Sequence, residues 1–154
     1  MSLLSQDKLR KKIRLFKNDN KLIVFTNGCF DLLHKGHKDL LNKASTYGDI
    51  LIVGINSDSS VKSIKGKNRP IEKEITRVDK LLKLDYVDYV IIFDSNTPEN
   101  IIRIISPDVL VKGGDYNLNN IIGAKYVIEN GGGVKIVPLT PGYSTTSIIE
   151  SNNR

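Results

Sequence analysis

The sequence has little of what marks secreted, disulfide-stabilised or membrane-spanning proteins. It contains one cysteine, Cys29, one methionine and no tryptophan. A single cysteine excludes an intrachain disulfide, so we expect a reducing, cytoplasmic setting. No apolar run approaches the roughly 18 residues of a membrane span, and the N-terminus has no apolar signal segment. We therefore expect neither secretion nor a membrane partner.

Acidic residues are fewer than basic ones, but the excess of positive charge is concentrated at one end. The formal net charge is +6 over 154 residues, and residues 1–21 hold seven cations against two acids. The rest is nearly neutral and lacks the cationic stripe with interleaved aromatics that is typical of a nucleic-acid-binding face. We expect no nucleic-acid partner, and a basic helix within residues 1–21 that packs on a body formed by residues 22–154.

Composition and patterning predict one globular α/β domain. Apolar residues make up 40% and charged residues 26%, which is ordinary for a folded protein that needs no disulfide or metal. The apolar runs that predict strands are residues 22–25, 50–55, 89–93, 109–111 and 134–137. The predicted helices are residues 5–17, 37–46, 72–83, one that Thr97 caps, 120–130, and a short last one that begins at Ser144. We expect Ile75 to face the core, and we expect residues 62–69 to lie in a polar segment.

Strands that are apolar throughout and alternate with helices are typical of parallel sheets covered on both faces. We therefore predict a Rossmann-like, doubly wound fold with a five-stranded parallel sheet and helices on both faces. In such folds ligands bind beyond the carboxyl ends of the strands. Those ends are Thr26–His37, Asn56–Asp58, Lys112–Asp115 and Gly142–Thr146. Their glycine, hydroxyl, amide and cationic groups suit a polyphosphate ligand.

Several common nucleotide sites are absent from the sequence. The first of these loops lacks the G-x-G-x-x-G pattern of dinucleotide folds, and no segment matches the Walker pattern G-x-x-x-x-G-K-[ST]. His34 and His37 instead lie at the expected start of a helix, whose N-terminus attracts phosphate. Two histidines that only satisfy local backbone groups are the alternative. Zinc is disfavoured because Cys29 is the only thiol, and we predict no metal site formed by the protein.

Two segments resemble the signatures of the cytidylyltransferase-like nucleotidyltransferases. Gly28-Cys29-Phe30-Asp31-Leu32-Leu33-His34-Lys35-Gly36-His37 is similar to their G-x-F-D-x-x-H-x-G-H signature, and Ser144-Thr145-Thr146-Ser147-Ile148 is similar to S-T-T-x-I. Both segments overlap the predicted carboxyl ends of strands, where we expect the ligand to bind.

The resemblance extends over most of the chain and narrows to one branch. Residues 53–58, 65–66 with 69–70, 97–98, 107–116 and 123–125 are similar to the heptose 1-phosphate adenylyltransferases, which make ADP-heptose for the lipopolysaccharide core. This resemblance implies that residues 22–154 form a nucleotidyltransferase domain. It also implies ATP and a sugar 1-phosphate as partners, Mg²⁺ arriving with ATP, and a homodimer as a common assembly.

The resemblance also implies roles for individual residues. The catalytic group is His34, His37, Lys65 and Arg77. The nucleotide-binding group is Asn27, Gly28, Cys29, Phe30, Gly36, Lys112, Gly113, Gly114, Asp115, Ser144, Thr145 and Thr146. The substrate-binding group is Asp31, Asn56, Asp58, Lys67 and Arg69. For Asp31, orientation of its own loop is the favoured role, because an acid beside bound phosphates does not attract them.

Three alternatives remain at this point. One is a glycerol 3-phosphate cytidylyltransferase, which would share both signatures. Another is a heptose enzyme that uses CTP or GTP, since base choice depends on a few pocket contacts. The third is a non-catalytic nucleotide-binding protein, or a nucleic-acid binder that uses the basic helix. Intact His34, His37 and Ser144 to Thr146 disfavour this third alternative.

Overall fold

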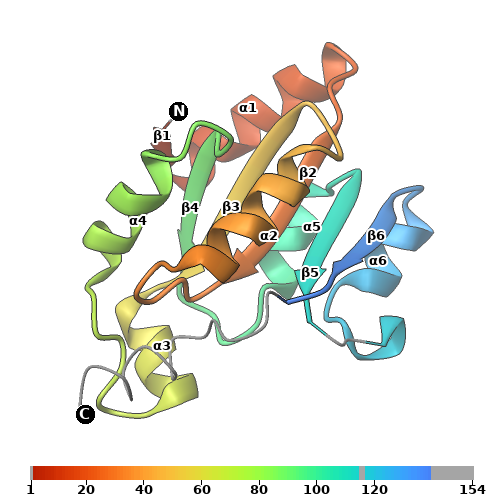
Figure 1. The fold of residues 1–154 in the computed structure, drawn as a ribbon. Helices are drawn as coiled ribbons and strands as arrows, with labels where there is room; N and C mark the ends of the chain where they lie inside the picture. Colours follow the sequence, from red (N-terminus) through yellow and green to blue (C-terminus); the bar gives the residue numbers. More distant parts are fainter. Residues whose placement is uncertain (1, 115–116, 140–154) are drawn as a thin grey trace.

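The computed structural model describes residues 2–114 and 117–139, which form an α/β fold around one parallel sheet (Figure 1). The strands are β1 Ser2–Leu4, β2 Ile23–Gly28, β3 Ile50–Asn56, β4 Tyr89–Phe93, β5 Val109–Gly113 and β6 Gly133–Val137. Their order is β1-β4-β3-β2-β5-β6, and all neighbouring pairs are parallel. The predicted doubly wound α/β fold is confirmed.

The sheet has six strands where the sequence predicted five. The additional strand, β1, pairs Ser2 to Leu4 with Tyr89 to Ile91 of β4, and Leu4 is buried. Three residues are too few to show a strand period in sequence. They become a strand because β4 has a free edge beside them.

Helices cover both faces of the sheet, as predicted (Figure 1). They are α1 Gln6–Asn18, α2 Lys35–Ser45, α3 Asp58–Lys65, α4 Glu74–Leu82, α5 Glu99–Ile105 and α6 Ala124–Glu129, with a short 3-10 helix, η1, at Leu118–Asn120. One apolar cluster joins Leu9 of α1 and Ile102 of α5 to Phe25 of β2. A second cluster joins Leu41 of α2 to Val24 of β2 and also includes α4. Because neighbouring residues of β2 belong to different clusters, its side chains alternate between the two cores.

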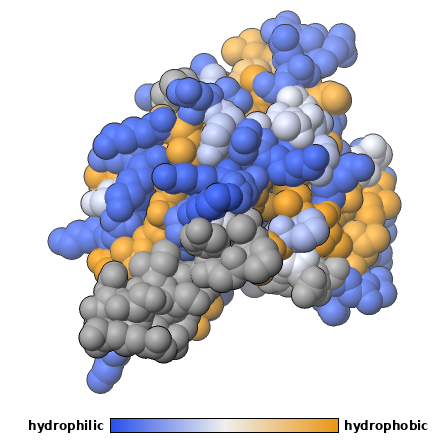
Figure 2. Space-filling view, in the orientation of Figure 1, coloured by the Kyte–Doolittle hydropathy of each residue, from blue (hydrophilic) through white to orange (hydrophobic). Residues whose placement is uncertain are grey.

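The basic N-terminal helix packs on the sheet through its apolar side. Ser5 Oγ accepts a hydrogen bond from the Lys8 backbone N–H at 3.3 Å, which caps α1 as predicted. Leu9 and Ile13 are buried, and the Lys17 ammonium donates to the Ser106 carbonyl at 2.8 Å. Most of the remaining cations of α1 lie on its exposed side. Figure 2 shows hydrophilic residues over much of the α2–α4 face, with hydrophobic residues toward the β5–β6 edge.

One helix was not predicted: α3 overlaps the start of the predicted polar segment, whose residues 62–68 are exposed, and Ser57 caps it, its Oγ accepting from the Ser60 N–H at 3.2 Å. Three other local predictions were wrong. Ile75 is 58% exposed, because α4 turns Arg77 and not Ile75 toward the core. Pro98 takes the N-cap position of α5 without a side-chain cap, so Thr97 does not cap that helix.

The third wrong prediction is the continuous helix over residues 120–130. Gly123, with a left-handed φ of 87°, separates η1 from α6. The last predicted helix, from Ser144, lies outside the described residues.

The strand order reverses at β2, and this reversal positions the site. From β2 the chain proceeds to β3 and β4 on one side, then crosses to β5 and β6 on the other. Backbone pairing between β2 and β5 joins Val24 to Val109 and Phe25 to Leu110. Beyond it the Thr26 hydroxyl donates to the Val111 carbonyl at 2.9 Å. A crevice at the carboxyl ends of two such strands is the usual ligand site of this architecture.

Candidate active site

A pocket of about 430 Å³ opens at the carboxyl ends of β2 and β5. Nine of the residues predicted from sequence line it: Asn27, Gly28, Cys29, Phe30, His37, Asn56, Lys65, Lys112 and Gly113. Leu40, Ile64, Asn96, Pro98, Ile122 and Leu139 complete the lining. The pocket therefore combines cationic, imidazole and amide groups with apolar side chains. This mixture suits a ligand that has both charged and uncharged parts.

Two histidines begin α2 and cap it reciprocally. His34 Nδ1 accepts from the His37 backbone N–H, and His37 Nδ1 accepts from the His34 backbone N–H, both at 3.3 Å. The two rings stack with their centroids 3.7 Å apart. Because each Nδ1 accepts a hydrogen bond, each neutral ring carries its proton on Nε2 and is a donor there.

Both imidazoles are neutral near pH 7. Burial lowers the pKa of His34. Burial, together with the nearby His34 and Lys65, lowers the pKa of His37 to about 3. The pair therefore acts through neutral N–H groups at the positive end of a helix, which is an arrangement suited to phosphate oxygens. His37 lines the pocket itself, whereas His34 lies behind it in the stack.

The loop that carries these histidines has an unusual backbone. Phe30 and Leu32 have left-handed φ values of 50° and 53°, which non-glycine residues adopt only when their surroundings hold them there. The buried Phe30 ring packs edge-on against the His37 ring, with centroids 5.2 Å apart. A Cβ on Gly28 would lie 3.0 Å from that ring. Gly28 thus makes room for Phe30, and Phe30 supports His37.

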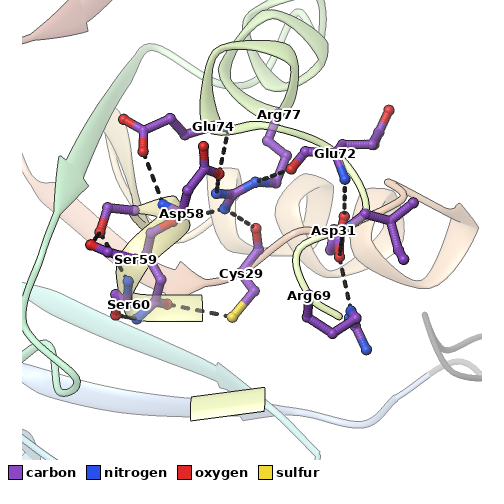
Figure 3. Close-up of polar contacts among 12 residues, drawn as sticks. Cys29, Asp31, Asp58, Ser59, Ser60, Arg69, Glu72, Glu74 and Arg77 are labelled. Carbon is purple, nitrogen blue, oxygen red and sulfur yellow. Dashed lines mark hydrogen bonds and ion pairs between the residues drawn. The ribbon is translucent and has the colours of Figure 1, made fainter. Parts of the chain in front are cut away.

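Asp31, predicted to contact substrate, is enclosed by the protein instead. Its carboxylate has no exposed surface and accepts hydrogen bonds from Arg69 Nε at 3.0 Å and from the backbone N–H groups of Ile71 and Glu72 at 2.8 and 2.9 Å. Burial alone would raise the pKa of Asp31, but these hydrogen bonds outweigh it and lower the pKa. Figure 3 shows that the contacts fasten the histidine loop to residues 69–72. This geometry matches loop orientation, the role favoured from sequence.

Arg77, predicted to act on phosphate, is a buried brace in this structure (Figure 3). Its side chain is fully enclosed, and its Nη1 donates at 2.8 Å to the backbone carbonyls of Cys29 and Asn56. Its Nε donates to the Glu72 carbonyl at 3.0 Å, and its Nη2 pairs with Asp58 Oδ1 at 2.8 Å. One guanidinium therefore joins the ends of β2 and β3 to the segment that leads into α4.

Two more predicted substrate contacts have protein partners. The Asp58 backbone N–H donates to Glu74 Oε1 at 2.9 Å, and the Glu74 backbone N–H donates to Asp58 Oδ1 at 2.8 Å, so α3 and α4 cap each other. Asn56 is 5% exposed; its Nδ2 donates to Ser60 Oγ at 3.0 Å, and its Oδ1 accepts from the Cys29 thiol at 3.7 Å. Asn56 lines the pocket with little surface, and Asp58 does not line it.

Lys65 and Lys112 bring positive charge to the pocket. Lys65 ends α3 and is exposed, whereas burial lowers the pKa of Lys112. Burial also raises the pKa of the Cys29 thiol, so the thiol stays protonated and is not a nucleophile. Lys67 is exposed and does not line the pocket, and Arg69 is held by Asp31.

The remaining predicted residues fall in three places. Gly36 is buried in the first turn of α2. Gly114 follows β5 with a left-handed φ of 114°, which favours glycine. Asp115, Ser144, Thr145 and Thr146 lie outside the described residues, so their predicted contacts remain predictions.

Sequence reasoning missed the contribution of the loop after β4. Asn96 and Pro98 line the pocket from this loop. The signal was available, because the same rule that selected the ends of the other strands applies to β4. The apolar lining residues Leu40, Ile64, Ile122 and Leu139 had no such signal, since nothing in sequence distinguishes them from core residues.

Two further searches cover the described residues alone. Within residues 2–114 and 117–139, no group of three or more His, Cys, Asp or Glu side chains is placed to hold a metal ion. In that same part of the chain, no helix has the length and apolar character needed to cross a bilayer.

Comparison with known proteins gives a family match over most of the chain. The cytidylyltransferase-like family model matches residues 25–151. The bifunctional protein HldE of Marinomonas sp. (strain MWYL1) is 48% identical over 151 residues, which are 98% of this chain and 32% of that protein. HldE of Helicobacter pylori (strain G27) is 47% identical over 95% of this chain and 31% of its own length. The chain thus spans about a third of the length of these curated relatives.

Two solved structures are similar in fold. The lipopolysaccharide core biosynthesis protein from Thermoplasma volcanium GSS1 superimposes with a TM-score of 0.61 at 27% identity, covering 78% of this chain and 97% of that one. Pantoate-beta-alanine ligase from Francisella tularensis, complexed with beta-gamma ATP and beta-alanine, gives a TM-score of 0.66 at 16% identity, covering 99% and 77%. The second likeness shows the shared fold alone.

Proposed function

The chain belongs to the cytidylyltransferase-like family of nucleotidyltransferases, and on that premise we propose that it transfers AMP from ATP to D-glycero-D-manno-heptose 1-phosphate. The products are ADP-heptose and pyrophosphate, for lipopolysaccharide core synthesis in the cytoplasm. The likeness to the HldE proteins and to the Thermoplasma volcanium protein supports the sugar and the pathway. The observation that carries the proposal is the stacked, reciprocally capped pair His34 and His37 at the pocket.

In the proposed reaction a phosphate oxygen of the sugar 1-phosphate attacks the α-phosphorus of ATP. The new phosphorus–oxygen bond forms as the bond to the β-phosphate oxygen breaks, and pyrophosphate leaves. Such a transfer needs positioning and charge neutralisation more than covalent chemistry. His37 donates from Nε2 to a phosphate oxygen, and the stack with His34 holds its ring in place. Lys65 and Lys112 neutralise charge that develops on the phosphates.

Mg²⁺ belongs to the substrate in this proposal. The two described acids of the predicted site do not line the pocket and are engaged by protein donors, Asp31 by Arg69 and Asp58 by Arg77 and Glu74. These residues do not fit a resident magnesium site. The ion would arrive with ATP, held by phosphate oxygens and water. Asp115 and Ser144 to Thr146 remain proposed nucleotide ligands on the strength of the family signatures.

The test is pyrophosphate release from heptose 1-phosphate with ATP, CTP, GTP or UTP in the presence of Mg²⁺. Release with ATP alone supports the proposal, and preference for another nucleotide changes the base but keeps the sugar. Activity only with glycerol 3-phosphate and CTP would refute the heptose reaction and support the glycerol 3-phosphate cytidylyltransferase alternative. Lys65→Met should lower kcat/KM by at least 10-fold, because the pocket loses a cation. Lys62→Met is the matched control, since Lys62 is an exposed lysine of the same helix outside the pocket lining.

A further inference from the structure

The side-chain oxygen of Asn27 has no hydrogen-bond partner among the described residues. In the described residues, Asn27 Oδ1 and Arg69 Nη2 are the buried side-chain polar atoms that lack a hydrogen bond. Arg69 has its Asp31 partner through Nε, whereas Asn27 Oδ1 has no partner in the part of the chain that the structure describes. A buried polar group without a partner destabilises a folded protein, and such groups are concentrated at functional sites. Asn27 is also one of the residues that line the pocket, so the unpaired oxygen belongs to a residue at the candidate ligand site.

The position of Asn27 separates it from the histidines. Asn27 follows Phe25 by two residues on β2, and Phe25 belongs to the core on the α1–α5 side of the sheet. His37 comes from α2, which covers the opposite side. Asn96 and Pro98 line the pocket from the loop that leads into α5. Asn27 and Asn96 are therefore two pocket-lining residues with amide side chains that come from the α5 side of the sheet.

An amide differs from a cation in the ligand atoms it can satisfy. Its nitrogen donates and its oxygen accepts, so its best partner carries both a donor and an acceptor. A phosphate group that is fully ionised has acceptors only and would leave the amide oxygen unpaired. A sugar hydroxyl has both. The chemistry of Asn27 thus matches an uncharged part of the ligand rather than an ionised phosphate, and a sugar hydroxyl is such a part.

We propose that Asn27, together with Asn96 of the same pocket, recognises a sugar hydroxyl and determines specificity for the sugar rather than for the phosphates. This inference rests on the proposed function, which supplies two sugars: the acceptor heptose and the ribose of ATP. The hydroxyl group is the shared chemistry, and the experiment separates the two sources.

The test compares Asn27→Val with Asn27→Thr, two side chains of the same shape that differ by one hydroxyl group. We expect Asn27→Val to raise the melting temperature by a few degrees, because the unpaired buried polar atom is gone. We expect the same variant to lose at least 10-fold in kcat/KM, with Asn27→Thr retaining more activity. A raised KM for the sugar phosphate alone identifies the acceptor hydroxyl. A raised KM for ATP, with lost preference for ATP over 2′-deoxy-ATP or 3′-deoxy-ATP, identifies the ribose.

Equal kinetic constants for wild type and both variants, or a lower melting temperature for Asn27→Val with unchanged KM values, would overturn the inference and make Asn27 structural. Failure of the proposed function is distinguishable. Wild-type protein that makes no product from heptose 1-phosphate refutes the reaction. The role of Asn27 can then still be tested by calorimetry, with ATP, its deoxy analogues and a panel of sugar phosphates binding to the Val and Thr variants. Loss of hydroxyl-dependent binding in Asn27→Val supports the proposed role of Asn27, and identical binding refutes that role.

Discussion

Replacement of Asp31 distinguishes two roles for this carboxylate. Removal of a side chain that binds substrate raises KM and leaves the stability of the fold nearly unchanged. Removal of a side chain that fastens two loops lowers stability and changes the kinetics through the displaced loops. The structure favours the second role, because Asp31 has no exposed surface and accepts from Arg69, Ile71 and Glu72.

The expected magnitude follows from these contacts. Asp31→Ala leaves a guanidinium that is 14% exposed without its counter-ion, and two backbone N–H groups without their acceptor. Breaking a buried ion pair by removing one partner costs about 3–5 kcal/mol. For a protein of this size, that corresponds to a fall in melting temperature of roughly 10 °C. Asp31→Asn keeps one acceptor oxygen for three donors, so we expect a smaller loss of about 2 kcal/mol.

The assay is urea unfolding of wild type, Asp31→Asn, Arg69→Met and the double variant between pH 7 and pH 3. Because the folded-state pKa of Asp31 is lowered, its contribution is present above the unfolded-state pKa of about 3.9 and is lost as the pH falls through the folded-state pKa. The difference between wild type and Asp31→Asn should therefore shrink toward pH 3. A pH-independent difference, or a stability cost near zero with a raised KM for sugar phosphate, would refute the fastening role.

Three other predictions follow from the same site. Arg77→Leu should lower the free energy of unfolding in urea by about 3–5 kcal/mol, because two buried backbone carbonyls lose their donor. The variant should also raise KM for both substrates as the loops move. Wild-type stability of the variant would contradict the bracing role of Arg77. In ¹⁵N NMR spectra of histidine-labelled protein, His34 and His37 should both show an unprotonated Nδ1 at pH 7. His37 should not titrate between pH 5 and 8, because its pKa is lowered to about 3. A titration of His37 near pH 6.5 would show that the stack is absent. Gly28→Ala should lower the free energy of unfolding by about 1–3 kcal/mol and abolish most activity, since its Cβ would lie 3.0 Å from the Phe30 ring that supports His37. An active variant of wild-type stability would mean that the ring has room to move.

Most of the architecture was accessible from local pattern. Apolar runs separated by amphipathic segments identified the five longer strands and the helices that cover them, because buried parallel strands and two-faced helices leave characteristic periodicities. Short or ambiguous elements were not accessible. β1 has three residues and depends on the free edge of β4, and α3 has few apolar residues and depends on the Ser57 cap.

The site was accessible in its location but not in its division of roles. The rule that ligands bind beyond the carboxyl ends of parallel strands selected most of the polar residues that line the pocket. The same rule cannot tell a side chain that faces the pocket from one that braces its walls. Asp31 and Arg77 carry the charges expected of phosphate or substrate contacts, yet both are enclosed by protein partners, which include Arg69, 38 positions from Asp31, and Cys29, 48 positions from Arg77.

The sequence by itself determined the fold class, the ligand edge of the sheet and the histidine pair, since each depends on neighbours close in the chain. Tertiary structure alone decided that His34 and His37 are neutral, that Asp31 and Arg77 are internal fasteners, and that Asn96 joins Asn27 in the lining of the pocket. The physical reason is that burial, pairing and pKa depend on which distant segments pack together, and local pattern does not specify those contacts.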